Sequence, residues 1–339
     1  MNGTGNYLML NEMTTLPDGF LDAKPDQLKA MLGSPTLIHL QGKNPRPLFV
    51  STLLHGNESS GLFALQAVLK SYEKKPLPRS LSLFIGNVSA AEQDQRVLEG
   101  QPDYNRVWPG TDHADCQETR LMQQVVDIMK KHKPFASIDL HNNTGRNPHY
   151  GCVNRVSAQY LQLARLFSHT VVYFTTPIGV QSQAFSAICP AVTLECGKVG
   201  ELDGISHASR YLDTVLQLDN LPDHNPTDID LLHTVARVTV NKEMDFSFDG
   251  SAEIKLEASI ELYNFREVKE NTEFAEVSQS ESEPFEVQDE QGNNVYESYF
   301  KAEGDKIILK KTVIPAMFTR NIDVIRQDCL CYLMEHFEQ

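Results

Sequence analysis

The 339-residue sequence predicts an α/β domain, with a mixed sheet flanked by helices, followed by a smaller β-rich domain. Three observations support this fold class. Between residues 47 and 220, apolar runs of strand length alternate with segments of helical period. Residues 220–228 (NLPDHNPTD) are rich in turn formers, as a linker would be. Beyond them the apolar segments are short, and several alternate with polar residues. We therefore expect a first domain over residues 1–222, with its core at about 47–220, and a second over 229–339.

The first domain is expected to alternate strands with helices along the chain. Residues 47–54 (PLFVSTLL) are apolar over the length of a buried strand, and the segment after them repeats apolar residues every three or four positions. The same spacing recurs over residues 116–132 and predicts a second amphipathic helix. The predicted strands cover residues 47–54, 81–86, 136–140, 170–174 and 191–194, and the predicted helices cover 59–72, 116–132, 158–169 and 206–218.

The second domain is expected to consist of short strands closed by one helix. Residues 289–293 (DEQGN) have the composition of a hairpin turn between two strands. Residues 322–337 predict a terminal helix. The predicted strands cover residues 235–240, 252–256, 259–265, 285–287 and 306–309.

The charge of the chain excludes some classes of function. The formal net charge of -15 argues against a nucleic-acid partner, because phosphate binding requires a basic face. The charge is uneven: residues 1–222 hold 19 Lys and Arg against 20 Asp and Glu, whereas residues 223–339 hold 11 against 25. This asymmetry suggests two parts with different roles. Since no apolar run approaches ~18 residues, we expect no membrane span.

The amino-terminal residues and the cysteines predict a cytoplasmic protein. Residues 1–6 (MNGTGN) have no basic region followed by an apolar stretch, so a secretory signal is not expected. The six cysteines have neither the spacing of a disulfide framework nor a paired C-x-x-C pattern of a structural zinc site. Reduced thiols in the cytoplasm are the simplest interpretation.

Reactive side chains follow three of the predicted strands directly. His55 and Glu58 come after the first strand, His141 follows residues 136–140, and Glu195 follows residues 191–194. Open α/β sheets bind their ligands at the carboxyl ends of the strands. Two histidines and one carboxylate form a catalytic zinc set with a fourth position open for water, which predicts hydrolysis. Glu195 is the candidate base beside that water. Asp139 is a candidate to orient His141, and a role in a strand-end turn is equally open.

Four motifs in this order resemble a known family: HGNE at 55–58, NR at 105–106, DLHN at 139–142 and TLECG at 193–197. The chain is similar, over about residues 47–220, to the succinylglutamate desuccinylase/aspartoacylase branch of the zinc carboxypeptidase-like superfamily. The β-rich C-terminal domain is also similar to that family. The resemblance implies a zinc carboxypeptidase-like mixed sheet.

The resemblance also implies a role for each matching residue. One zinc ion per chain is bound by His55, Glu58 and His141, and Glu195 is the general acid/base. Arg96 polarises the scissile carbonyl, which suits a guanidinium aimed at a developing oxyanion. The last matching residues, Asn105 and Arg106, bind a substrate carboxylate, and a guanidinium can do so through two parallel hydrogen bonds.

The resemblance implies a zinc-dependent amidohydrolase in which zinc-activated water cleaves the amide bond of an N-acyl amino acid with a carboxylate. A metallocarboxypeptidase or amidase acting on short peptides is the alternative enzyme, and a zinc-binding protein without turnover is the alternative of another class. The partner is then a small molecule rather than a nucleic acid or a membrane, and homo-oligomerisation stays open.

One position departs from the family pattern. Deacylases of this family tend to carry an arginine ten residues before the catalytic glutamate, where it binds a second carboxylate. This chain has Phe185 there. Either the charge has moved to Arg146, Arg155 or Lys198, or the requirement is lost. A neutral or aromatic acyl group or side chain is therefore as compatible with the sequence as a second carboxylate.

Overall fold

The computed structural model describes residues 9–278 and 283–337 of the chain. The chain divides into two compact units, which are described separately. Of the described residues, the first unit comprises 9–142, 149–171 and 177–229, and the second comprises 143–148, 172–176, 230–278 and 283–337. In the described ranges, no helix is both long enough and apolar enough to cross a membrane.

The first unit is built on a mixed sheet with the strand order β1-β2-β4-β3-β5-β8-β6-β7, in which only the first two residues of β7, Thr170 and Val171, belong to this unit. Four neighbouring strands, β4, β3, β5 and β8, run parallel to one another, while β2 and β6 are antiparallel to their neighbours β4 and β8. The bounds are β1 Asn11–Met13, β2 Thr36–Leu40, β3 Gly42–Thr52, β4 Leu77–Ile85, β5 Ala136–His141, β6 Tyr150–Val153, β7 Thr170–Tyr173 and β8 Ala191–Glu195.

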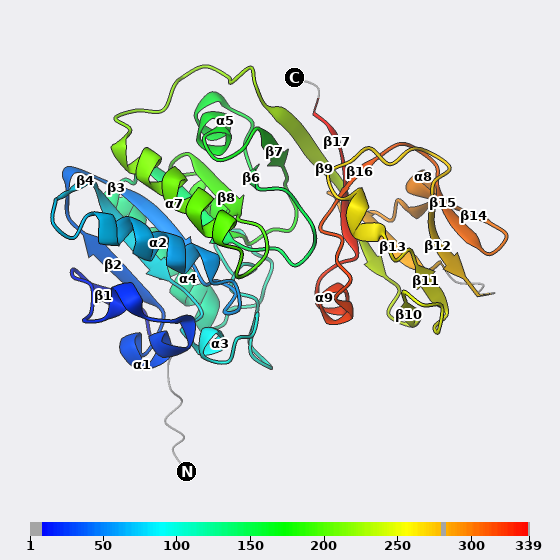
Figure 1. Cartoon of the computed structure of the whole chain (residues 1–339), viewed down its shortest axis with the longest axis horizontal. Coiled ribbons are helices and arrows are strands. Elements are labelled where there is room, and N and C mark those ends of the chain that lie inside the picture. Colours follow the sequence, from blue (N-terminus) through cyan, green and yellow to red (C-terminus); the bar gives the residue numbers. More distant parts are fainter. Residues whose placement is uncertain (1–8, 279–282, 338–339) are drawn as a thin grey trace, which may run out of the picture. The chain divides into compact units, whose positions relative to one another are not determined.

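Helices cover both faces of this sheet. Gly61 of α2 lies against Thr52 and Leu140, and a Cβ at this glycine would come within 2.5 Å of Thr52 Oγ1, so the close packing of α2 requires glycine here. Residues of α6 contact Ser137 and Thr193, which point to the other face because side chains alternate along a strand. Figure 1 shows α2 and α7 side by side. The helices are α1 Leu28–Leu32, α2 Ser60–Ser71, α3 Val88–Glu92, α4 Gln117–His132, α5 Ala158–Arg165, α6 Gln181–Phe185 and α7 Leu202–Gln217, with short 3-10 turns at Phe20–Asp22 and Pro25–Gln27.

The second unit is β-rich, as expected. Strands β13 and β17 pair antiparallel with β9, β16 pairs with β17, and a separate sheet has the order β10-β11-β12-β15-β14. Its core includes the mutually contacting rings of Phe274, Phe285 and Phe300, and the ring of Phe318 contacts that of Phe274. The bounds are β9 Asp230–Val240, β10 Phe246–Ser247, β11 Ile254–Leu256, β12 Glu273–Val277, β13 Phe285–Asp289, β14 Phe300–Glu303, β15 Lys306–Leu309, β16 Ile314–Ala316, β17 Cys331–His336, α8 Tyr296–Tyr299 and α9 Ile322–Gln327, with a 3-10 turn at Ile260–Tyr263.

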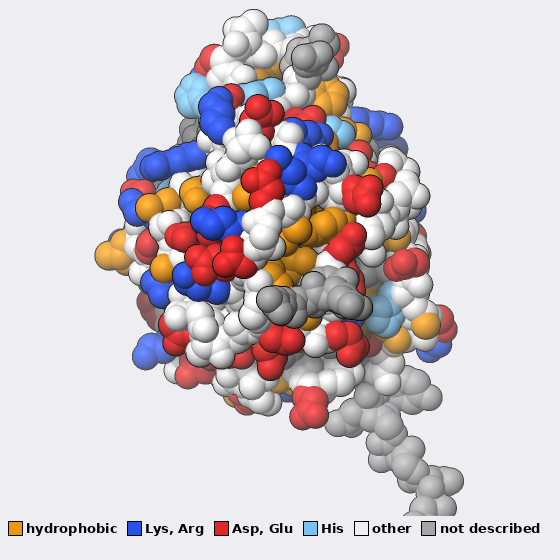
Figure 2. All heavy atoms as spheres, turned by 90° about the vertical axis from the view of Figure 1, so that its right-hand side faces the viewer, with side chains coloured by type: hydrophobic (Ala, Val, Ile, Leu, Met, Phe, Trp, Pro, Cys, Tyr) orange, Lys and Arg blue, Asp and Glu red, His pale blue; other side chains and the backbone are white. Residues whose placement is uncertain are grey.

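The acidic excess of the second half of the sequence is not confined to one spot. Figure 2 shows acidic side chains spread over the side of the second unit that faces the viewer, with basic side chains among them and apolar ones between. The acidic excess of this half is therefore distributed over the face rather than gathered in one patch.

Three expectations for the second half of the sequence are wrong in part. The predicted helix over residues 322–337 ends at Gln327, and Cys331–His336 is strand β17, which pairs with β9 and β16. These pairings satisfy the backbone of an apolar segment whose composition also suits a helix. Residues 259–265 contain a 3-10 turn at Ile260–Tyr263 rather than a strand. The predicted turn at 289–293 closes only a single antiparallel bridge, between Gln288 and Asn294, because the chain then continues into α8 and the ladder partner of β13 is β9.

Candidate metal-binding and catalytic site

Three buried side chains meet at the carboxyl ends of β3 and β5. His55 lies just beyond β3, Glu58 lies just before α2, and His141 is the last residue of β5. Nδ1 of His55 is 2.8 Å from Oε1 of Glu58, and Nδ1 of His141 is 2.8 Å from Oε2 of the same carboxylate. One potential ligand atom from each residue lies within 4.8 Å of the others, so the three could hold a metal ion. The sequence expectation that these residues converge agrees with this geometry.

The far side of each imidazole faces a carboxylate. Nε2 of His55 is 2.9 Å from Oδ1 of Asp103, and Nε2 of His141 is 2.7 Å from Oδ2 of Asp139. The hydroxyl of Ser51 donates to the other oxygen of Asp139 at 2.6 Å. A carboxylate that accepts the Nε2 proton leaves Nδ1 free as a ligand, which is the usual arrangement at histidine-metal sites.

Opposite charges balance within the cluster. Burial disfavours the charged form of Glu58, but His55 and His141 outweigh it and hold the pKa of the carboxyl well below its usual range. Burial likewise disfavours protonation of His141, yet Asp139 and Glu58 raise the pKa of this histidine well above its usual value. The backbone N–H of Asn142 also donates to Glu58 at 3.0 Å. The carboxylate is therefore ionised and its orientation is fixed, as a metal ligand must be.

Glu195 ends strand β8, directly beside His141 in the register of β5 and β8. Burial raises the pKa of its carboxyl to about 7. Its Oε2 atom is buried, and no described residue forms a hydrogen bond with it. A carboxyl group with a pKa near neutrality can both accept and return a proton, which is the requirement for a general acid/base.

Arg96 lies against the same cluster. Its Nη1 is 3.3 Å from Oε1 of Glu58, and its Nη2 is 3.1 Å from Oδ2 of Asp103. Burial disfavours the ionised form of Asp103, but His55 and Arg96 outweigh it and hold the pKa of this carboxyl well below its usual range. Asp103 thus positions an imidazole and a guanidinium at once.

Asn105 and Arg106 occupy the edge of the cluster. The Asn105 amide nitrogen is 3.2 Å from Nε2 of His141, and its carbonyl oxygen accepts the backbone N–H of Gln181 at 2.9 Å. Arg106 donates to the backbone carbonyl of Asn105 at 2.8 Å. Asn105 therefore contacts the cluster directly, whereas Arg106 is connected to it through Asn105.

Sequence reasoning did not identify Asp103 or Asn142 as site residues. Asp103 lies in a segment without regular structure between α3 and α4, where no strand end marks it. In the sequence, only its position two residues before Asn105 could have indicated that Asp103 belongs to the site. Asn142 directly follows His141, and its side chain joins the hydroxyl of Ser60 to the carbonyl of Gly197.

Phe185 faces the interior. Its ring stacks on Phe49 with centroids 4.3 Å apart and contacts Trp108 edge-on, and its side chain is fully buried. The position ten residues before Glu195 therefore contributes to the core rather than to charge recognition.

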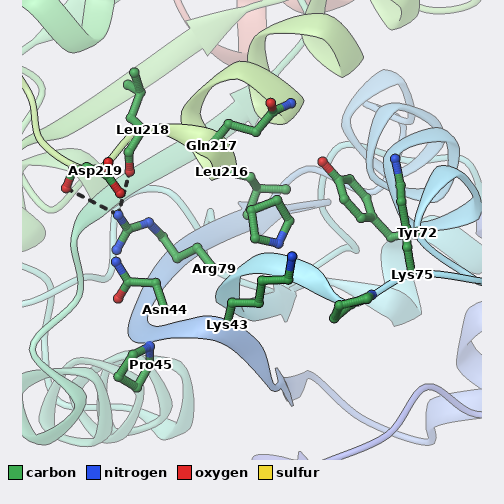
Figure 3. Close-up of a pocket in the computed structure, with 12 residues that line it drawn as sticks. Lys43, Asn44, Pro45, Tyr72, Lys75, Arg79, Leu216, Gln217, Leu218 and Asp219 are labelled. Atoms are coloured by element: carbon green, nitrogen blue, oxygen red, sulfur yellow. Dashed lines mark hydrogen bonds between the residues drawn. The ribbon is translucent and has the colours of Figure 1, made fainter.

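A pocket of about 690 Å³ lies at the opposite ends of the strands and is separate from this cluster. Lys43 and Arg79, near the starts of β3 and β4, line it together with the C-terminal end of α7 (Figure 3). The guanidinium of Arg79 donates to the backbone carbonyls of Arg46 at 2.8 Å and Leu218 at 2.6 Å, and it lies 3.9 Å from the ring centroid of Phe135. These contacts join elements of the fold, so Arg79 has a structural role.

The fold and this cluster place the chain among α/β proteins that gather potential metal ligands at the carboxyl ends of a parallel run of strands. Residues 45–218 match the family described as the succinylglutamate desuccinylase/aspartoacylase catalytic domain, and the chain belongs to this family. The family expected from the ordered motifs is thus confirmed.

Solved structures support the fold assignment. The succinylglutamate desuccinylase from Chromobacterium violaceum is 17% identical with a TM-score of 0.59, and the match covers 89% of each chain. Murine aminoacylase 3 is 12% identical with a TM-score of 0.58, covering 88% of this chain and 97% of the other. The ectoine utilization protein EutE (DoeB) from Ruegeria pomeroyi is 12% identical with a TM-score of 0.55, covering 89% and 88%. No curated protein matches the sequence.

Proposed function

We propose that this protein is a zinc-dependent amidohydrolase that cleaves the amide bond of an N-acyl amino acid bearing a free carboxylate. The observation that carries this proposal is the buried His55–Glu58–His141 cluster beside Glu195, whose pKa is about 7. Membership of a family of hydrolytic deacylases supports the reaction class.

The donor set fits a zinc ion. His55, Glu58 and His141 would hold one ion per chain, because two imidazole nitrogens and a carboxylate are the ligands of many catalytic zinc sites. When bound, zinc supplies Lewis acidity, which polarises a carbonyl and lowers the pKa of water. Asp103 and Asp139 hold the two imidazoles in the orientation that this binding needs.

The remaining residues divide the chemistry among them. Glu195 takes a proton from the attacking water on its carboxylate and returns it to the leaving amine. Arg96 stabilises the oxyanion, since Asp103 holds its guanidinium beside the ligand set. Asn105 and Arg106 orient the substrate carboxylate. The products are a carboxylic acid and a free amino acid.

The protein is proposed to act in the cytoplasm on a small molecule, with neither nucleic acid nor membrane as partner. The near-neutral first half of the sequence is compatible with an anionic substrate, although the overall charge is -15. Long-range repulsion by the acidic second half would slow substrate capture and would weaken with added salt.

The proposal is tested by metal analysis combined with a substrate panel. Freshly purified protein should contain about one zinc per chain, lose hydrolysis on chelation and regain it with Zn²⁺. The panel varies the acyl group and the amino acid independently and includes unblocked dipeptides. Release of amino acids from dipeptides but not from N-acyl amino acids would favour the carboxypeptidase alternative. Zinc without turnover on any member would favour a binding protein, and neither bound zinc nor rescue would reject the site.

A further inference from the structure

Asn142 is bonded to two different parts of the proposed site. It directly follows His141 at the end of β5 and is 5% exposed. Its backbone N–H donates to Oε2 of Glu58 at 3.0 Å. Its side chain contacts Ser60, the first residue of α2, and Gly197, which lies beyond the end of β8. Segments that follow three different strands therefore meet at this one asparagine.

The side-chain amide of Asn142 is fully engaged in hydrogen bonds. Its Oδ1 accepts the backbone N–H of Ser60 at 3.1 Å. Its Nδ2 donates to the hydroxyl of Ser60 at 2.9 Å and to the backbone carbonyl of Gly197 at 2.8 Å. A backbone N–H can only donate and a carbonyl can only accept, so these partners fix which end of the amide faces each of them. The position therefore requires a short side chain that carries both an acceptor and a donor.

The bond to Gly197 holds the backbone that follows Glu195. In the pairing of β5 with β8, His141 lies opposite Glu195, and the backbone N–H of Cys196 donates to the carbonyl of His141 at 2.9 Å. The amide of Asn142 supplies the next bond, to Gly197, where the chain turns away from the strand with a φ of +78°. Asn142 thus extends the hydrogen bonding beyond the last paired residues of the two strands.

We infer that Asn142 is a positioning residue that sets the place of Glu195 relative to the metal ligands. This inference rests on the proposed function. Glu195 can take a proton only if its carboxylate lies within hydrogen-bond reach of the attacking water beside the ligand set. Asn142 is bonded to Glu58 of that set and to the segment that carries Glu195, so it fixes one relative to the other. A displacement of about 1 Å between such groups costs about 10²-fold in rate.

Two substitutions of Asn142 remove the bond to Gly197 in different ways. Aspartate has the shape of asparagine but no donor, so Asn142→Asp loses the bond to the Gly197 carbonyl. It keeps an acceptor for the backbone N–H of Ser60, and the hydroxyl of Ser60 can donate to the new carboxylate. Asn142→Ala removes the whole amide and adds no charge. An effect shared by both variants is therefore due to the lost bond and not to the added charge.

The test is steady-state hydrolysis of the best N-acyl amino acid of the substrate panel, with zinc and folded protein measured on the same preparations. We expect kcat per folded chain to fall at least about tenfold in both Asn142 variants, with KM changed less than about threefold. The zinc content should stay at about one ion per chain. A residue with a structural role alone would lower the amount of folded protein and leave kcat per folded chain unchanged.

Gln66→Glu is the matched control for Asn142→Asp. Gln66 lies on α2 and is as buried as Asn142, and its Nε2 donates to the backbone carbonyls of Phe20 and Ala23, each at 2.8 Å. The substitution removes buried amide donors in the same way, but from partners outside the proposed site. We expect it to lower the free energy of unfolding and to leave kcat per folded chain and the zinc content unchanged.

Gly197→Ala disturbs the other end of the same bond. A Cβ at Gly197 would come within 3.1 Å of Nε2 of His149, and the φ of +78° disfavours any side chain there. This variant should also lower kcat and keep its zinc. In the double variant with Asn142→Ala, the loss of kcat should be smaller than the product of the two separate losses, because both changes break one link. The losses from Asn142→Ala and Gln66→Glu should instead multiply.

The outcomes separate this inference from the proposed function. A folded, zinc-loaded Asn142 variant with the kcat of the wild type overturns the inference and leaves the proposed function intact. So does a loss that excess zinc restores, a rise in KM without a fall in kcat, or an equal loss of kcat in Gln66→Glu. If Asn142→Ala does not fold, Asn142→Asp and Gly197→Ala decide by the same criteria. A wild type that hydrolyses no member of the panel overturns both.

Discussion

At the carboxyl ends of β3, β5 and β8, the buried charged groups are paired with one another, whereas at the amino ends of β3 and β4 the buried Arg79 is held by backbone carbonyls. His55, Glu58 and His141 form a set of titratable groups, and Oε2 of Glu195 has no hydrogen-bond partner among the described residues. Arg79 instead donates to carbonyls of two chain segments. A buried charged group whose polar atoms remain available therefore indicates a reactive site. A buried charged group whose polar atoms are bonded to backbone carbonyls indicates a structural role.

The largest expected effect comes from Glu195→Gln, which keeps the shape of the side chain but cannot accept the proton. We expect kcat to fall about 10²- to 10⁴-fold while zinc content stays at one ion per chain. Steady-state hydrolysis and metal analysis on the same preparation measure both quantities. The exposed Glu73→Gln serves as the matched control and should retain full activity. Undiminished hydrolysis by the zinc-loaded Glu195→Gln variant would remove Glu195 from the mechanism.

At the other end of the strands, Arg79→Met should affect stability and not catalysis. The methionine keeps much of the apolar stem but leaves the carbonyls of Arg46 and Leu218 without their donor. We expect the free energy of unfolding to drop by about 3 kcal/mol, with kcat changed less than about twofold. Urea denaturation and hydrolysis assays separate the two effects.

The control for Arg79→Met is Arg120→Met, which breaks an exposed ion pair with Asp115. Because solvent screens exposed ion pairs, they contribute little to stability, and this variant should be nearly as stable as the wild type. If Arg79→Met lost more activity than folded protein, Arg79 would also contribute to catalysis. The distinction between a catalytic and a structural end of the strands would then not hold.

A smaller effect is expected from Asp139→Asn, which changes a fully buried carboxyl group. The carboxylate of Asp139 faces Nε2 of His141 and directs Nδ1 toward Glu58. The amide should weaken zinc binding about 10- to 100-fold in competition with a chelator, and excess zinc should restore most of the activity. Asp115→Asn, at an exposed position, is the control. An unchanged zinc affinity would show that the contact seen here does not orient the histidine.

The positions of the site residues in the fold also explain which of them the sequence could predict. His55, Glu58, His141 and Glu195 were recognisable because each follows an apolar strand, and parallel strands bring their carboxyl ends to one edge. Asp103 was not, because its place depends on contacts with His55 and Arg96 that form only in the fold.

The same reason accounts for the errors in the second unit. The segment Cys331–His336 has apolar residues that suit either a helix or a strand, and its pairing with β9 decides between them. Helix α6 was too short to be predicted, although it carries Ser182 and the buried Phe185. Local pattern therefore identified the strand ends but not the segments whose structure depends on distant partners.

The smallest expected effect is a pH-dependent gain in stability from Glu195→Gln in zinc-free protein. Burial raises the pKa of this carboxyl from 4.5 to about 7, so the folded state binds more protons than the unfolded chain between those values. The stability of the wild type is then greatest below the unfolded pKa and declines as the pH rises through about 7. Glutamine carries no charge and avoids this loss.

The variant should therefore match the wild type near pH 4 and exceed it by about 1–2 kcal/mol near pH 8. This is less than the roughly 3 kcal/mol that the full shift would give, because the residue is partly exposed to solvent. Urea denaturation of chelated protein at both pH values measures the difference, and Glu73→Gln should show none. If the difference in the free energy of unfolding were equal at both pH values, the pKa of Glu195 would not be raised toward neutrality. The assignment of Glu195 as general base would then rest on its position alone.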